Sequence, residues 1–323
     1  MRKLARLLGA GLWLSLACNA ALADEASAPQ QLLARMSRAL RELDYQGSMV
    51  YQHDGRVDAL RLFHAAGDPE RERLSSLNGP PREVVRRGGE VVCFQRDGST
   101  ISLTSSGTRS LIPLAPNLAS SSVIGTGYVP VAGPVDRVAG FSAQIVELRP
   151  RDEFRYGYRL WLDRKSDLLL RADLMGSNGQ ALEQVMFVNL EVGITPNEQD
   201  MAAPLGEMPT GSLESERNLQ MPGERWRIRD LPVDFALIAR TALPGDADGA
   251  AEHLLYGDGI ANVSVYVERV ASSGVNSVGF GARGALNVYT RTLGNYSVTV
   301  LGSVPAITVE RLGRSLEAVP AAH

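Results

Sequence analysis

Hydrophobic and polar residues alternate along this chain with two different periods, and each period predicts one kind of element. From Pro29 to Leu43 the apolar residues recur every three or four positions, which predicts one amphipathic helix. After this segment the period falls to two in several short runs, as is typical of antiparallel strands with one buried face. The runs are residues 45–51, 57–64, 84–86, 91–95, 100–104 and 144–148. Gly, Asp and Asn clusters between them predict a meander.

Three longer alternating runs follow, at residues 156–162, 168–174 and 182–190, joined by short polar turns. In the first run Tyr156, Tyr158, Leu160 and Leu162 point to one side of the expected sheet. Trp161 falls on the other, mostly polar side, so we expect that side to be partly covered.

The periodicity disappears between Gly193 and Gly223, where Pro, Gly, Ser, Asn and acidic residues predominate. This composition is typical of a domain linker or a long surface excursion. A second set of short strands follows, and residues 305–316 have the pattern of a helix with proline at its start. The strands are expected at 226–228, 235–241, 253–256, 262–269, 286–292 and 297–301. The chain is therefore expected to be an α+β protein with a large antiparallel β domain and a smaller sheet with a C-terminal helix.

The first 23 residues have the organisation of a secretory signal peptide. Met1 to Arg6 carries three positive charges, Leu7 to Ala17 is apolar, and Ala21-Leu22-Ala23 offers a cleavage site. Export is therefore expected. Lipid attachment at Cys18 is the alternative, although Ser15 stands where lipoprotein signals usually have an aliphatic residue.

Charge and cysteine content narrow the choice of function. Removal of residues 1–23, which hold three basic and no acidic residues, would leave 30 Lys and Arg against 36 Asp and Glu, a net charge of −6. This balance gives no general attraction to nucleic acid. Cys93 would then be the only cysteine, so no intrachain disulfide could form, and its apolar neighbours favour a buried position over a reactive thiol.

The sequence offers no catalytic or metal-binding constellation. "GFGARG" at 279–284 has the spacing of a dinucleotide-binding turn, but a strand rather than a helix is expected after it. The four histidines are scattered and lack metal-ligand spacing, and no nucleophile elbow is present. We therefore expect no enzyme activity, no cofactor and no metal.

One basic stretch, "REVVRRGGEVVCF" at 82–94, has two interpretations. Its two Val-rich runs flank Gly88-Gly89, which predicts a tight β-hairpin. Arg82, Arg86 and Arg87 are either solvated residues of this hairpin or a contact surface for carboxylates or phosphates. Lys3 and Lys165 are the only lysines, so arginine is the usual cation of this chain. The presence of three arginines therefore does not by itself distinguish a solvated hairpin from a contact surface.

Several longer segments resemble the RseB/MucB family. They are "NGPPREVVRRGGEV" at 78–91, "YGYRLWLD" with "LLLRADLMGSNGQALEQVMF" within 156–187, "LLYGDGIANVSVYVE" at 254–268 and "LGNYSVTVLGSVP" at 293–305. Each segment alone is a strand with its turn, but their combination and order, behind a signal peptide, are specific. The resemblance covers both halves of the chain.

The resemblance implies a periplasmic negative regulator of an extracytoplasmic, envelope-stress sigma factor. Such a regulator binds the periplasmic domain of a transmembrane anti-sigma factor of the RseA or MucA type and shields it from proteolysis. Misplaced lipoprotein or lipopolysaccharide components release it. The implied fold is a half-open antiparallel β-barrel with a helix, as in the lipoprotein carriers, followed by a smaller domain. Homodimer formation is left open.

These expectations give the following domain boundaries: a signal peptide at 1–23, a lipoprotein-carrier-like β domain at 24–195, a linker at 196–222 and a small α+β domain at 223–318. The linker and the region from Gly245 to Glu252 depart from the family in composition, and cysteines that some members carry in the second half are absent. Loops of this kind often carry contacts, so these departures concern partner specificity rather than the fold.

A curved sheet with an apolar concave face could also hold acyl chains. The candidate lining residues are Met49, Tyr51, Leu60, Leu62, Tyr156, Tyr158, Leu160 and Leu162. The same alternation would serve an ordinary core. A periplasmic lipid or lipoprotein carrier is therefore the alternative to a regulator, although a carrier would need only the first domain. An envelope hydrolase is disfavoured because no catalytic constellation is present.

Overall fold

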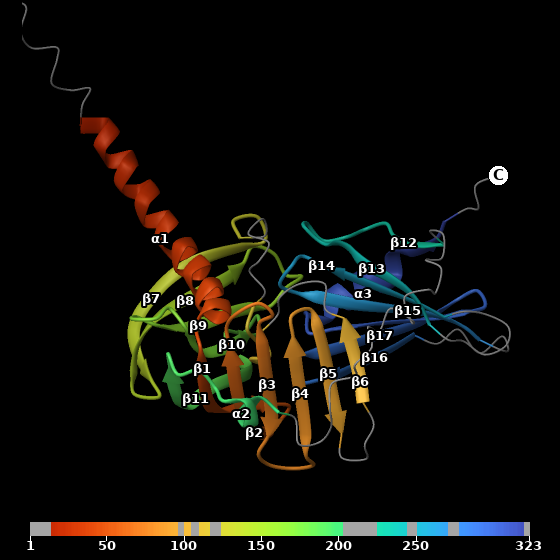
Figure 1. Cartoon of the computed structure of the whole chain (residues 1–323). Helices are drawn as coiled ribbons and strands as arrows, with labels where there is room; N and C mark the ends of the chain where they lie inside the picture. Colours follow the sequence, from red (N-terminus) through yellow and green to blue (C-terminus); the bar gives the residue numbers. More distant parts are fainter. Residues whose placement is uncertain are drawn as a thin grey trace, which may run out of the picture.

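The computed structural model describes residues 14–95, 100–104, 110–116, 124–202, 225–243, 251–270 and 278–319, with only the backbone at 14–27, 95 and 100–104. It contains one large and one smaller antiparallel sheet, each with a helix packed on it (Figure 1). Among the described residues, no helix has both the length and the apolar character needed to cross a membrane. The predicted fold class is confirmed.

Eleven strands form the large sheet, in the order β6-β5-β4-β3-β2-β1-β11-β10-β9-β8-β7. The first six are β1 (Tyr45–His53), β2 (Arg56–Ala65), β3 (Arg71–Ser76), β4 (Arg82–Arg87), β5 (Glu90–Gln95) and β6 (Thr100–Thr104). The others are β7 (Tyr128–Val138), β8 (Phe141–Pro150), β9 (Gly157–Asp163), β10 (Leu169–Met175) and β11 (Ala181–Val192). Each strand follows its predecessor as a neighbour except at the centre, where β1 pairs with β11 and sets Tyr45 opposite Val192.

The C-terminal turns of helix α1 (Leu14–Glu42) pack on the concave side of this sheet, against β7 and β8, while its N-terminal half projects away from the sheet (Figure 1). The predicted helix is present but begins before Pro29, because the preceding residues are rich in Leu and Ala, which are strong helix formers. The buried side of its last turns presents Leu33, Met36 and Leu40 to the sheet. Burying each such side chain stabilises the fold by about 1.5–3 kcal/mol.

A short helix, α2 (Glu198–Met201), lies at the start of the segment expected to be a linker. Its first turn is capped by Asn197, whose side chain accepts a hydrogen bond from the Asp200 amide at 2.9 Å. Arg71 of β3 donates a fork to Glu198 at 2.9 and 3.0 Å. The expected linker therefore begins as a helix docked on the large sheet, and its residues 203–222 lie outside the described residues.

The smaller sheet has six strands in the order β13-β14-β15-β18-β17-β16. They are β13 (Ala236–Leu243), β14 (Ala251–Gly257), β15 (Asn262–Arg269), β16 (Val278–Arg283), β17 (Leu286–Leu293) and β18 (Tyr296–Gly302). Helix α3 (Ala306–Ser315) packs on β17 and β18, and a separate pair joins β12 (Trp226–Ile228) to β19 (Leu316–Ala318). Val309 and Leu312 of α3 are buried against the valines of the sheet, so this unit has its own core.

The pattern of the sequence did not predict β3, β7, β16 and β19. β3 reads "RERLSS" and β7 contains two prolines and a glycine, so neither shows a clear alternation of apolar residues. β16 contains two glycines of the "GFGARG" motif, and Gly284 forms its turn to β17 with φ +59°. A strand therefore follows the motif, as expected, and the helix N-terminus that a dinucleotide site requires is missing here.

Cys93 is half-buried rather than buried. It alternates along β5 with Val92 and Phe94, which form a small apolar cluster with Val85 on the other face of the sheet. Because neighbouring residues of a strand point to opposite faces, the apolar run did not reveal which face was covered.

Candidate partner-binding surfaces and a buried charge cluster

The predicted hairpin at 82–94 is confirmed: β4 and β5 pair with Arg87 opposite Glu90, and Gly88 has a φ of +56° in the turn. Its arginines do not share one environment. Arg82 and Arg87 are exposed, whereas Arg86 is 1% exposed. The structure therefore separates the cluster into two surface cations and one buried cation.

Arg86 binds carboxylates of its own chain. Its Nε donates to Glu72 at 2.9 Å, and its Nη2 donates to Glu70. Glu72 also accepts hydrogen bonds from the Ser110 hydroxyl at 3.0 Å and from the Leu111 amide at 2.8 Å. Arg86 is thus neither a solvated turn residue nor free for an external acidic group, because the neighbouring strand β3 and the segment before it supply its partners.

His64 completes this cluster from β2. Its Nδ1 lies 2.7 Å from the Leu43 carbonyl oxygen, its Nε2 lies 2.9 Å from Glu70, and its ring stacks on Tyr45 with 4.4 Å between centroids. Burial, followed by the charge of Glu72, raises the pKa of Tyr45. Burial alone would raise the pKa of Glu70, but hydrogen bonds from His64 and Arg86 outweigh it and hold that pKa below its ordinary value.

The donor atoms of His64, Glu70 and Glu72 lie close enough together to suggest a metal site. However, the Arg86 guanidinium already occupies oxygens of both carboxylates, so a divalent cation would have to displace it. The four side chains fit an internal network in which one arginine and one histidine bind the two acids.

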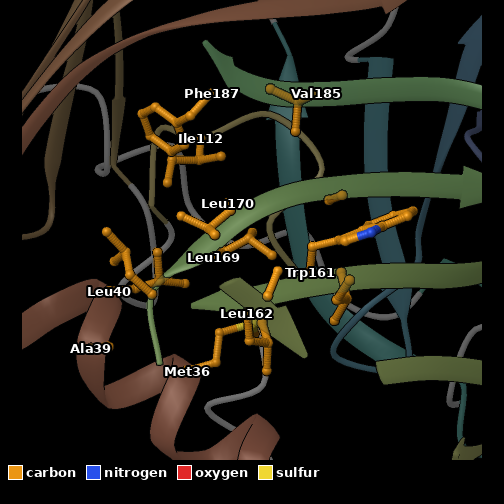
Figure 2. Close-up of a cluster of buried hydrophobic side chains, with 14 of the residues drawn as sticks. Met36, Ala39, Leu40, Ile112, Trp161, Leu162, Leu169, Leu170, Val185 and Phe187 are labelled. Atoms are coloured by element: carbon orange, nitrogen blue, oxygen red, sulfur yellow. The ribbon is translucent and has the colours of Figure 1, made fainter. Parts of the chain in front are cut away.

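The candidate apolar residues fall into two groups. Met49, Leu62, Leu160 and Leu162 are buried in the core that α1 completes, and Figure 2 shows Met36 of α1 beside Leu162. Tyr51, Leu60, Tyr156 and Tyr158 are only partly buried. The Tyr51 hydroxyl donates to Glu183 at 2.5 Å, and burial together with this carboxylate raises its pKa. At Met49, Leu62, Leu160 and Leu162, the concave face of the sheet is therefore filled by the protein's own side chains.

Trp161 is buried on the other face of β9, which confirms that this face is covered. Its indole Nε1 donates to Asp136 at 2.8 Å, and the Arg171 guanidinium stacks 4.1 Å from its ring centroid. Polar groups thus contribute to the cover of this face, although Trp161 also belongs to the main apolar cluster.

The two sheets meet at the loop between β8 and β9. Arg155 of this loop forms a buried ion pair with Asp258, which directly follows β14 of the small sheet, with 2.7 Å between Nη1 and Oδ2. Beside it lies an open cleft of about 560 Å³, lined by Tyr158 and Met175 from the large sheet and by Pro305 and Ile307 at the start of α3. Tyr158 is thus brought to the junction, and the Tyr156 hydroxyl accepts a hydrogen bond from Asn287 of β17 at 3.1 Å.

Sequence reasoning missed Arg155, because "RPRDEFRYG" reads as an ordinary charged loop. Its partner Asp258 is 103 positions away, and no local pattern links the two residues. The only available signal was the density of charge in a loop that leads into a strongly apolar strand.

Two family models match the chain: the MucB/RseB N-terminal domain over residues 28–205 and the MucB/RseB C-terminal domain over residues 220–317. The sigma factor AlgU regulatory protein MucB of Pseudomonas aeruginosa is 30% identical over an alignment of 317 residues that covers 93% of this chain and 94% of that protein. The sigma-E factor regulatory protein RseB of Haemophilus influenzae is 28% identical over an alignment of 309 residues that covers 93% of this chain and 95% of that protein.

Solved structures give the same picture. The MucA/MucB complex of P. aeruginosa matches with a TM-score of 0.74 at 27% identity, covering 91% of this chain and all of that one. MucB in complex with MucA(peri) gives 0.73 at 28% identity, with 90% and 99% covered. MucB alone gives 0.62 at 27% identity, with 91% and 98% covered. These relatives have regulatory names, in agreement with the expectation of a protein that is not an enzyme. On both of its domain models, this chain belongs to the MucB/RseB family.

Proposed function

We propose that this protein is a periplasmic negative regulator of an extracytoplasmic sigma factor and binds the periplasmic part of a MucA- or RseA-like anti-sigma factor. The observation that carries the proposal is the likeness, across both sheets, to MucB bound to MucA(peri). A likeness confined to the large sheet would have left a simple carrier equally plausible. The N-terminal segment with the features of a signal peptide supports a periplasmic location.

Protection of the anti-sigma factor from proteolysis, and its release by lipid or lipoprotein signals, belong to the same proposal. Bound protein would cover a cleavable extended segment, because proteases need an exposed and flexible chain. For the lipid signal, the partly exposed residues Tyr51, Leu60, Tyr156 and Tyr158 are the remaining candidates, since the buried positions are already filled. At the turn of the β4–β5 hairpin, Arg87 is exposed and accessible to an acidic partner.

A lipid or lipoprotein carrier is the second candidate. It would use the concave face of the large sheet, yet Met49, Leu62, Leu160 and Leu162 are packed against the side chains of α1 and its neighbours. Because these inner positions are already filled, we favour the regulator.

Binding to the host's MucA-like periplasmic segment tests the proposal. We expect calorimetry with the purified full chain, without residues 1–23, to detect binding at micromolar protein, and protease digestion of the segment to slow when the protein is added. Arg82→Ala and Arg87→Ala should mainly change the salt dependence of binding, because exposed rim charges act over a screened distance. Light scattering of the same samples reports whether the protein is a homodimer.

The absence of binding in calorimetry and in a pull-down would overturn the regulator. Binding of lipopolysaccharide or a lipoprotein acyl chain by the same protein would then favour the carrier.

A further inference from the structure

The loop that joins β8 to β9 contacts the small domain, and the side chain of Arg155 lies at the centre of this contact. That side chain is 0% exposed, and so is the side chain of its partner Asp258. A guanidinium placed at such depth is costly unless every donor is satisfied. Its surroundings therefore indicate what the contact is built to do.

All three guanidinium nitrogens of Arg155 have partners. Nη1 donates to Asp258 at 2.7 Å, Nη2 to the Val233 carbonyl oxygen at 2.6 Å, and Nε to Asp152 at 3.1 Å. The group also lies 5.5 Å from the ring centroid of Tyr128 in the large sheet and 5.2 Å from that of Phe235 in the small domain. Residues of both domains thus enclose one planar cation.

Asp258 is held rigidly from its own side. Its Oδ1 accepts hydrogen bonds from the Ile260 and Ala261 amides at 2.8 and 2.7 Å, while Oδ2 faces Arg155. The carboxylate therefore cannot follow Arg155 if the two domains separate. Ion pairing in this geometry is either complete or lost, which makes it suitable for fixing one arrangement of the domains.

Weaker contacts surround this centre. The Phe154 carbonyl oxygen accepts a hydrogen bond from Thr308 of α3 at 2.7 Å, and the Arg311 guanidinium lies 4.5 Å from the Phe154 ring centroid. At the rim, Arg283 in the β16–β17 hairpin pairs with Asp54 in the turn between β1 and β2 at 2.5 Å. The junction therefore has a buried core and an exposed second contact.

We propose that Arg155 is a positioning residue that holds the two domains in the arrangement competent to bind the anti-sigma factor. This inference rests on the proposed function. It is supported by a difference between known structures: this chain is more similar to the two MucA-bound forms of MucB than to MucB alone, at nearly equal identity and coverage. A partner that recognises the joined arrangement binds more weakly when that arrangement is only one of several.

The test uses Arg155→Met, which keeps the length of the side chain and removes its charge and fork. Arg151→Met is the matched control, because Arg151 is exposed in the same loop. Asp258→Asn is the second variant, since an asparagine oxygen can still accept from Ile260 and Ala261. We expect calorimetry with the MucA-like periplasmic segment to show binding weakened at least about tenfold for Arg155→Met, and unchanged for Arg151→Met.

A disulfide at the rim separates positioning from simple damage. A Cβ built on Gly284 lies 3.5 Å from the Asp54 Cβ, within the spacing of a disulfide. We expect Asp54→Cys with Gly284→Cys, in a Cys93→Ser background, to restore the affinity of Arg155→Met to within about threefold when oxidised. Reduction should abolish this rescue, which also controls for the strain of a cysteine at the positive φ of Gly284.

A folded Arg155→Met protein that binds the segment as the wild type does would overturn the inference. If that variant does not fold, Asp258→Asn decides in the same way. If the wild type itself fails to bind, the proposed function fails. Small-angle scattering of the same samples then decides the inference: an identical profile for wild type and Arg155→Met contradicts a role in positioning the domains.

Discussion

At the scale of single residues, the side chains around His64 show how charge is accommodated below the surface of the large sheet. Both ring nitrogens of His64 face oxygen atoms, those of a backbone carbonyl and of the Glu70 carboxylate. The Arg86 guanidinium pairs with both Glu70 and Glu72. Loss of Arg86 or of either acid therefore leaves a buried charge without its counterpart.

Glu70→Gln tests this balance through pH. The pKa of folded Glu70 lies below its ordinary value of 4.5, so the ionised carboxylate stabilises the fold above about pH 4.5 and loses this effect as the pH falls through the folded pKa. We expect the variant to lose about 3 kcal/mol of unfolding free energy at neutral pH. The difference from the wild type should shrink on acidification. Urea unfolding at a series of pH values measures both effects.

Arg87→Ala is the control for this series, because Arg87 is exposed on the same sheet and should change stability by no more than about 0.5 kcal/mol. If the difference in unfolding free energy between Glu70→Gln and the wild type stayed constant down to acidic pH, Glu70 would not stabilise the fold as an ionised member of this cluster.

At the scale of elements, α1 supplies the apolar surface that fills the curved sheet. Met36 is 0% exposed and packs in the same cluster as Leu162 (Figure 2). We expect Met36→Ala to lower the unfolding free energy by about 2–5 kcal/mol, because it removes buried apolar atoms and leaves a cavity. Arg38→Ala, on the exposed side of the same helix, should cost no more than about 0.5 kcal/mol. If thermal unfolding showed the same loss of unfolding free energy for Met36→Ala and Arg38→Ala, α1 would not complete this core.

The elements also show how far sequence reasoning reaches. Strands with a regular alternation, such as β1 and β15, were predicted within a few residues, because one buried face is sufficient to set the pattern. β7 and β16 were missed because prolines and glycines obscure alternation at the edges of the two sheets. The burial of Arg86 and Arg155 could not be predicted from the sequence, because it depends on acidic residues supplied by other strands and loops.

At the scale of the whole molecule, two ligands are expected to act on one junction. If lipid and anti-sigma factor stabilise different arrangements of the two domains, each must weaken the binding of the other by the same factor. We expect a saturating concentration of lipopolysaccharide to weaken the binding of the MucA-like segment by about 5- to 150-fold. Calorimetric titrations in both orders measure the two factors.

A segment affinity that is unchanged by lipopolysaccharide would show that the domains do not form such a switch. The oxidised Asp54→Cys/Gly284→Cys protein provides the matched control, because fixed domains should lose this coupling while they still bind the segment.

The position of β1 at the centre of the large sheet has a consequence for how the chain is made. β1 joins β11 across 145 residues, as the side-chain hydrogen bond between Gln46 and Glu191 illustrates, so the middle of the sheet closes last in the order of synthesis. Until Ala181–Val192 has been made, β1 keeps an open edge that could pair with a foreign strand. If the chain is exported as proposed, its half-made sheet has to be protected from aggregation until this last strand is available.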